Sequence, residues 1–135
     1  MWVMGRVYLA NAFSLNMLNL PRGVGASICV EELDLERFVE RVKLHTQQGD
    51  LVCAINNAST AELAEKLLTM PWLGEDVEVR LRCELKRIKL QPGDTLYVIQ
   101  LKFRPHGGKI YDYNEIVKLL RENELTFYAV YYGLC

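Results

Sequence analysis

Two polar segments follow short apolar runs and open predicted helices, and each carries groups that could hold an anion. The first segment contains Asn11 and Ser14. A helix start leaves backbone N–H groups unpaired and carries partial positive charge, so polar side chains beside it can help to bind a phosphate or a carboxylate. Ordinary helix capping by the same residues is the simpler alternative, and it requires no ligand.

The second segment has the same design, with Asn57, Ser59 and Thr60 after the apolar run at residues 51–55. The order Ser-Thr-Ala-Glu from Ser59 to Glu62 predicts a capping box, in which the serine side chain accepts from a backbone N–H of the first helical turn. Capping therefore competes with ligand binding as the reason for this pattern too.

A glycine-containing loop after the predicted strand at residues 95–103 holds Arg104, His106 and Lys109. Arginine can contact a phosphate through two N–H groups, and glycine lets the backbone approach a ligand closely. A solvated loop with an exposed histidine is the alternative. If the strands before the three segments are parallel, the three segments meet at one edge of the sheet, where open α/β sheets bind ligands.

Strands and helices alternate along the chain, which predicts an α/β fold: a mixed sheet of five or six strands, flanked by helices, in a single domain at residues 1–135. Apolar patterns predict strands at 6–10, 26–30, 51–55, 77–90, 95–103 and 126–132. Helices are predicted after the caps Asp34 and Asp112 and at the capping box, and Asn123 suits a helix end. The strand at 95–103 is largely apolar on both faces, with Gln100 as an exception, which predicts a central position.

Composition excludes several classes of protein. The 135 residues are 50% hydrophobic, so wholesale disorder is not expected, and the net charge of -1 argues against binding of long nucleic acid through bulk charge. No apolar run reaches the roughly 20 residues of a membrane span, and the N-terminus lacks the pattern of a signal peptide. We therefore expect a cytoplasmic protein with no membrane partner. A basic stretch at residues 80–89 is interpreted as a solvated strand edge, with a nucleic-acid contact as the alternative.

The four cysteines, Cys29, Cys53, Cys83 and Cys135, are widely spaced and form no CxxC pair. This spacing predicts buried free thiols and no zinc site; a disulfide would be expected mainly in a hyperthermophile. No clustered carboxylates and no Ser-His-Asp or Cys-His arrangement can be recognised. We expect neither a metal nor a cofactor.

Residues 7–18, Val-Tyr-Leu-Ala-Asn-Ala-Phe-Ser-Leu-Asn-Met-Leu, resemble the opening of the viral ring nuclease family, which contains type III anti-CRISPR proteins. Blocks at 54–60, 93–101 and 125–128 agree in order and approximate spacing. The resemblance implies a homodimer that binds cyclic tetra-adenylate, a cyclic oligoadenylate, across its subunit interface. It also implies metal-free cleavage, in which a ribose 2′-hydroxyl attacks the adjacent phosphate and the 5′ oxygen leaves.

By this resemblance Asn11, Ser14 and Asn16 match the family's ligand-facing opening, and Gln100 and Arg104 match its polar site strand. Arg104 would stabilise the charge of the phosphorane.

Three positions depart from the family pattern, and one of them is the family's arginine at the start of its middle strand, which has no clear match around residues 85–87. Asn57 stands where the family has its catalytic histidine, and Gly107 replaces a glutamate. An asparagine cannot donate a proton to a leaving alkoxide near neutral pH. Three hypotheses follow: the chain binds the ring without cutting it, cuts slowly with Arg104, or uses His106 as the missing acid.

We favour binding of cyclic oligoadenylate with weak or no cleavage, and the ring size stays open. Arg104 and His106 are the candidate catalytic residues. The candidate ligand-binding residues are Asn11, Ser14, Asn16, Asn57, Ser59, Thr60, Gln100 and Lys109. The alternative function is a structural or partner-binding viral protein that kept the fold and lost the ligand.

Overall fold

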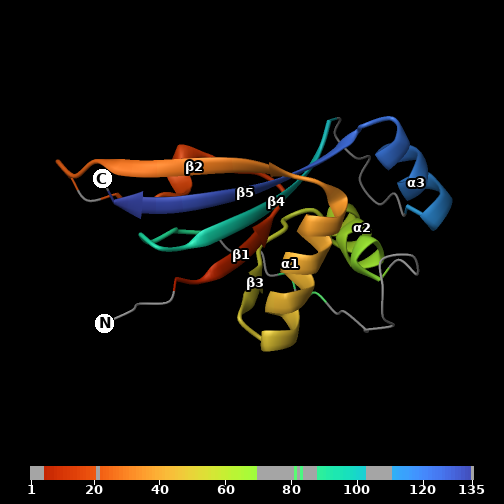
Figure 1. Ribbon diagram of the computed structural model, residues 1–135, viewed down its shortest axis with the longest axis horizontal. Helices are drawn as coiled ribbons and strands as arrows, with labels where there is room; N and C mark the ends of the chain where they lie inside the picture. The colour runs from red at the N-terminus through yellow and green to blue at the C-terminus, as the bar shows by residue number, and fades with distance from the viewer. Residues whose placement is uncertain are drawn as a thin grey trace.

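Five strands form one mixed sheet in the computed structural model, which describes residues 5–20, 22–69, 81, 83, 88–102 and 111–134 (Figure 1). The strands are β1 (Val7–Ala10), β2 (Ala26–Leu33), β3 (Leu51–Cys53), β4 (Thr95–Leu101) and β5 (Leu125–Leu134), in the spatial order β2-β5-β4-β1-β3. β1 is parallel to β3 and β4, and β5 is antiparallel to β2 and β4. The predicted α/β class is confirmed, and so is the central position of β4.

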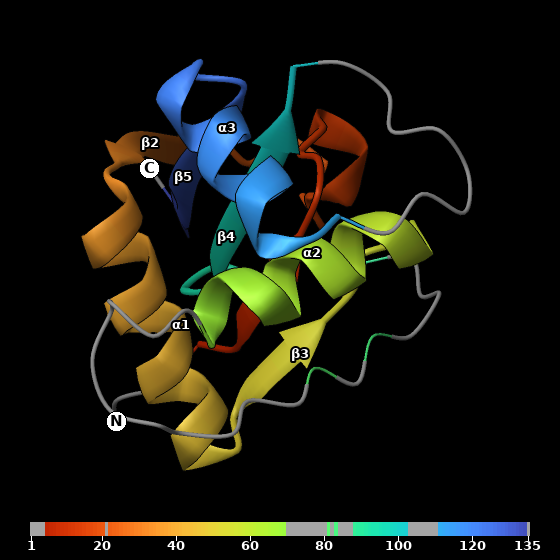
Figure 2. The ribbon, with the colours of Figure 1, turned by 90° about the vertical axis from the view of Figure 1, so that its right-hand side faces the viewer.

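One face of the sheet is covered by helices, as Figures 1 and 2 show. The helices are α1 (Leu35–Gln48), α2 (Ala58–Leu68) and α3 (Tyr113–Arg121). Successive strand residues point to opposite faces, so β1, β4 and β5 each contribute to two clusters. Leu9, Tyr97 and Ile99 pack with the helices, whereas Leu96 and Val98 belong to a smaller cluster on the other face.

The second face is only partly covered. Residues of the segment after β1, which contains a short 3₁₀ helix (Leu15–Met17), pack on it together with Ile88 and Leu90. Residues 88–90 are held there by backbone hydrogen bonds from Leu90 N to Met17 O (2.6 Å) and from Asn19 N to Leu90 O (2.9 Å). Most of the predicted strand at 77–90 lies outside the described residues.

Helix ends follow the predicted capping residues in two helices. Asp34 accepts from the backbone N–H of Arg37, and Asp112 forms a capping box with Glu115. Asn123 follows α3 with a φ of 55°, in the left-handed region where asparagine is tolerated better than most residues. No described helix is both long and apolar enough to cross a membrane.

The start of α2 differs from the prediction. Its N-cap is Asn57, whose Oδ1 accepts from Ser59 N (2.9 Å) and Thr60 N (3.2 Å), and the helix begins at Ala58. The predicted cap at Ser59 is therefore wrong. Asparagine caps at least as well as serine, and starting the helix two residues earlier places Ser59 and Thr60 inside its first turn, where both are buried.

The cysteine prediction is also wrong in part. Cys53 and Cys83 form a disulfide across 30 residues of sequence, and their backbones form a parallel bridge. Cys29 is free, but it is exposed on β2 rather than buried. Cys135 lies outside the described residues. The spacing of the cysteines carried no sign of the pairing, because only the strand arrangement brings residue 83 beside the end of β3.

The turn before β4 is fixed by the buried carboxylate of Asp94, which is 4% exposed. Its two oxygens accept from Arg6 N (2.8 Å) and Gln91 N (2.7 Å), so one side chain links the turn to the start of β1. Close packing follows at this corner: a Cβ on Gly5 would lie 1.8 Å from the carbonyl oxygen of Gly93. Only glycine fits at residue 5 without a backbone shift.

We expect Asp94→Ala to lower the free energy of unfolding by about 2 kcal/mol, because two N–H groups lose a charged acceptor and water can replace it only in part. Asp94→Asn should cost about half as much, since its amide retains one acceptor oxygen. Urea unfolding of the two variants checks this ranking. Equal stability of Asp94→Ala and the wild type would contradict the structural role.

Candidate functional site

The carboxyl ends of β1 and β3 lie side by side because the two strands are parallel. Asn11 follows β1 and Asn56 follows β3, and Asn11 Nδ2 donates to Asn56 Oδ1 at 3.0 Å. This contact confirms that the first two predicted segments meet at one sheet edge. β4 is parallel to β1 and ends at the same edge. The third segment, with Arg104, His106, Gly107 and Lys109, lies outside the described residues.

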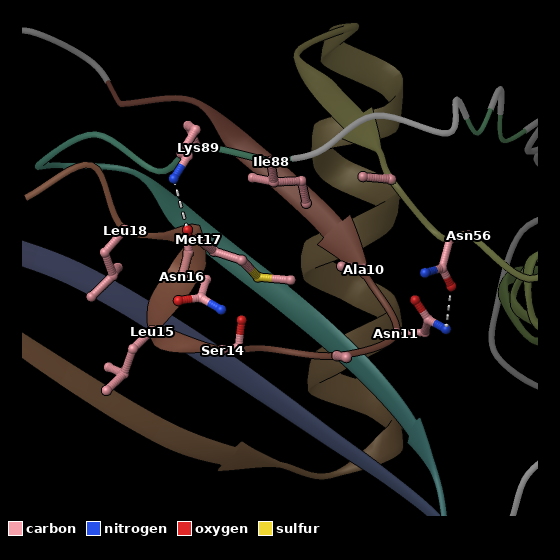
Figure 3. Close-up of a pocket in the computed structure, with 12 residues that line it drawn as sticks. Ala10, Asn11, Ser14, Leu15, Asn16, Met17, Leu18, Asn56, Ile88 and Lys89 are labelled. Atoms are coloured by element: carbon pink, nitrogen blue, oxygen red, sulfur yellow. Dashed lines mark hydrogen bonds between the residues drawn. The ribbon is translucent and has the colours of Figure 1, made fainter.

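A polar cavity of about 700 Å³ opens beside this junction on the partly covered face of the sheet (Figure 3). Its polar lining consists of Asn11, Ser14, Asn16, Asn56 and Lys89. Its apolar lining includes Ala10 of β1 and Ile88. The structure therefore brings together three of the predicted ligand-binding residues, those of the segment after β1.

Ser14 and Asn16 are exposed, and neither side chain has a hydrogen-bond partner in the described part of the chain. Ser14 stands at the N-cap position of the 3₁₀ helix, yet its hydroxyl makes no capping bond. The capping alternative therefore does not account for Ser14. Its hydroxyl and the Asn16 amide remain available to a ligand.

Lys89 supplies a positive charge to the cavity lining. Its Nζ donates to the backbone oxygen of Asn16 at 2.9 Å, which directs the ammonium group toward the segment after β1 (Figure 3). Sequence reasoning assigned Lys89 to a solvated strand edge and did not include it in the site. The only sign in the sequence that Lys89 could reach the site is its position beside Leu90. Leu90 pairs with residues 17–19, and this pairing depends on the tertiary fold.

The residues at the start of α2 are placed differently. The Oδ1 of Asn57 is occupied by its two capping bonds, and Ser59 and Thr60 are only 4% and 3% exposed. Capping and helix packing account for these three residues, and a ligand-binding role for them stays a prediction. Asn56, which sequence reasoning did not select, is the exposed residue of this segment that reaches the cavity.

Gln100 is exposed near the end of β4 and lies outside the polar cavity, in a smaller neighbouring groove. A third cavity, about 470 Å³, lies beside Cys83 and carries Glu62 and Glu65 in its lining. Glu65 accepts from the backbone N–H of Leu81 at 2.7 Å. Carboxylates repel an anion, so the third cavity is a poor phosphate site and the polar cavity is the stronger candidate.

Tyr97 of β4 lies close to Tyr131 of β5 and Arg41 of α1, and its titration predicts that the stability of the protein depends on pH. Burial raises the pKa of Tyr97 above its ordinary value of 10.0, and the nearby Tyr131 raises it further, while Arg41 opposes the shift. As pH rises past 10, the unfolded chain releases this proton before the folded chain does, so the free energy of unfolding should fall.

Urea unfolding between pH 9 and 11 measures this loss of stability. Tyr97→Phe should make the decline with pH shallower, whereas Tyr113→Phe, at an exposed tyrosine of α3, should leave it unchanged. An identical decline in Tyr97→Phe and the wild type would contradict the prediction.

Comparison with known proteins gives two findings. The STIV B116-like family matches residues 7–127. Among solved structures, B116 of Sulfolobus turreted icosahedral virus (STIV) is similar, with a TM-score of 0.78 and 30% sequence identity. That similarity covers 94% of this chain and 99% of the viral chain. A search of curated proteins found no match.

Proposed function

The chain belongs to the STIV B116-like family. We propose that it binds cyclic oligoadenylate, with cyclic tetra-adenylate as the first candidate. Its fold is that of a viral protein, B116. One observation carries the proposal: the segment that resembles the opening of the ring nucleases lines an open polar cavity at the carboxyl ends of two parallel strands. This is where ligands bind in open α/β sheets.

The cavity offers the groups that a ribose-phosphate ring needs. The hydroxyl of Ser14 and the amide of Asn16 can donate to phosphate or accept from a 2′-hydroxyl, and both are unpaired within the described residues. Lys89 adds a cation within the same lining. Arg104 and Lys109 are proposed to contribute further positive charge from the loop after β4, and Gln100 to bind the ligand from the strand itself.

We propose weak or no cleavage. Oδ1 of Asn57 serves as the cap of α2, and an amide cannot act as a general acid near neutral pH. Residual cleavage would proceed by attack of a ribose 2′-hydroxyl on the adjacent phosphate, with departure of the 5′ oxygen. Arg104 would stabilise the phosphorane charge, and His106 would protonate the leaving oxygen.

Calorimetry with cyclic tetra-adenylate tests the binding proposal. We expect saturable heat from the wild type and weaker binding by Ser14→Ala and Asn16→Ala. Ser27→Ala on β2 and Asn114→Ala on α3 are matched controls at exposed positions and should bind like the wild type. Absence of saturable heat at micromolar protein would refute binding of this ring.

Product chromatography after long incubation separates binding from cleavage. Linear products from the wild type but not from His106→Ala would assign the acid to His106. Equal rates in the two proteins would exclude His106 from the reaction, and no products from either would leave a binding protein.

The proposed assembly is a homodimer, because a ring with two-fold symmetry can be shared by two equal half-sites. Sedimentation velocity of the free and ligand-bound protein measures it. A monomer that binds one ring per chain would contradict a site shared between subunits.

We expect Lys89→Gln to weaken ring binding about threefold to tenfold at low salt and to lower the salt dependence of binding by about one counterion. The physical reason is the loss of one cation from the cavity lining. Binding isotherms at several salt concentrations measure both effects. Lys118→Gln removes the same charge from the exposed surface of α3 and should change neither. An unchanged salt slope in Lys89→Gln would exclude contact with a phosphate.

A further inference from the structure

A mainly apolar groove of about 260 Å³ lies on the partly covered face of the sheet. Its walls are formed by side chains of β2, β4 and β5 and of the segment after β1. They include Phe13, Val30, Val98, Tyr128 and Val130. Gln100 is the polar residue of the lining, and it is exposed near the end of β4.

The groove and the polar cavity flank the same short segment. Ala12 lines both hollows, Phe13 lines the groove, and Ser14 lines the polar cavity. One ligand can therefore place an apolar part on one side of this segment and a polar part on the other. A nucleotide has this division, since its base is flat and weakly hydrated and its ribose-phosphate is strongly polar.

We infer that this groove receives an adenine base and that Gln100 recognises its edge, an inference that rests on the proposed function for the remainder of the ligand. A glutamine amide matches adenine with two hydrogen bonds: its oxygen accepts from the N6 amino group and its nitrogen donates to N7. Within the described residues the Gln100 amide has no hydrogen-bond partner, so it can form both bonds without breaking others.

The walls suit the faces of the base. Phe13 and Tyr128 are half-buried aromatic residues, and aromatic side chains are common partners of unstacked bases. The volume of about 260 Å³ lies just below the roughly 300–1,000 Å³ typical of small-molecule sites, which is adequate for one base but not for a whole ring. The valines would exclude water from the remaining base surface.

NMR titration of the full chain tests where a base binds, with adenosine 5′-monophosphate and cyclic tetra-adenylate as separate probes. We expect both to shift the Gln100 side-chain amide and the methyl signals of Val30 and Val130. Shifts caused by the monophosphate alone would support the groove and contradict the proposed ring. Ring binding without shifts at these three residues would overturn the groove and retain the proposed function. The absence of any shift at these three residues with either probe would also overturn the assignment of the groove.

Gln100→Met tests recognition of the base edge, because it keeps the length and removes the amide. We expect binding of adenosine 5′-monophosphate to weaken about 5-fold to 100-fold, and its preference over inosine 5′-monophosphate to disappear, since inosine lacks the N6 amino group. Gln47→Met, an equal exchange at an exposed site of α1, should leave both unchanged. A preference for adenine that survives in folded Gln100→Met would overturn the assignment.

Discussion

Replacing Cys53 and Cys83 together with alanine is expected to lower the free energy of unfolding by about 3–4 kcal/mol. The disulfide closes a loop of 30 residues, and a cross-link of that span removes many conformations from the unfolded chain. The folded state should change little, because Leu81 is also held by the hydrogen bond from its backbone N to Glu65, and Leu90 by burial in the core. Since the total free energy of unfolding of a domain is about 5–15 kcal/mol, this loss would be a large share of it.

Chemical denaturation of the oxidised wild type, the reduced wild type and the double variant measures the effect. The reduced protein and the double variant should have similar stability, both below the oxidised protein. Cys29→Ala is the matched control, because Cys29 is exposed and unpaired, and it should be neutral. Equal stability of the oxidised and reduced protein would contradict the prediction, because a cross-link that closes a 30-residue loop should restrict the unfolded chain.

The local features of the fold could be predicted from sequence because their causes are local. Aspartates 34 and 112 accept from backbone N–H groups three residues ahead, so their role depends only on neighbouring residues. The apolar pattern of β4 likewise showed two buried faces, and the sheet order confirms it as the central strand. The start of α2 could not be fixed because Asn57 and Ser59, two residues apart, are both good caps, and the sequence does not rank them.

Long-range contacts could not be predicted in the same way. The Cys53–Cys83 pair and the pairing of Leu90 with the segment after β1 join residues 30 or more positions apart. For the site, the segment after β1 was correctly expected to meet the end of β3. The contact is made by Asn56 rather than Asn57, because the capping of α2 engages the Oδ1 of the second asparagine. Lys89 lies in the cavity lining only because of tertiary packing, which the local sequence pattern does not show.

Phe38→Ala is expected to lower the free energy of unfolding by about 3–5 kcal/mol, because it removes a fully buried ring from the helix-covered core. Phe38 belongs to α1 and packs against Phe127 of β5 at 4.7 Å between ring centroids and against Tyr97 of β4 at 6.5 Å. The variant loses both the burial of the ring and its aromatic contacts, and it leaves a cavity between the helix and the two strands.

Phe38→Leu keeps most of the side-chain volume and should cost less than half as much. Comparison of the two variants therefore separates the effect of the cavity from the loss of the aromatic contacts. Leu15→Ala, at a side chain that is 72% exposed, should change stability by no more than about 0.5 kcal/mol. Thermal and urea unfolding of the three variants measure the ranking.

Because Phe38 fixes α1 on the face opposite the polar cavity, any folded fraction of Phe38→Ala should still bind the ring. A variant that keeps its stability but loses binding would instead show that the cavity depends on α1.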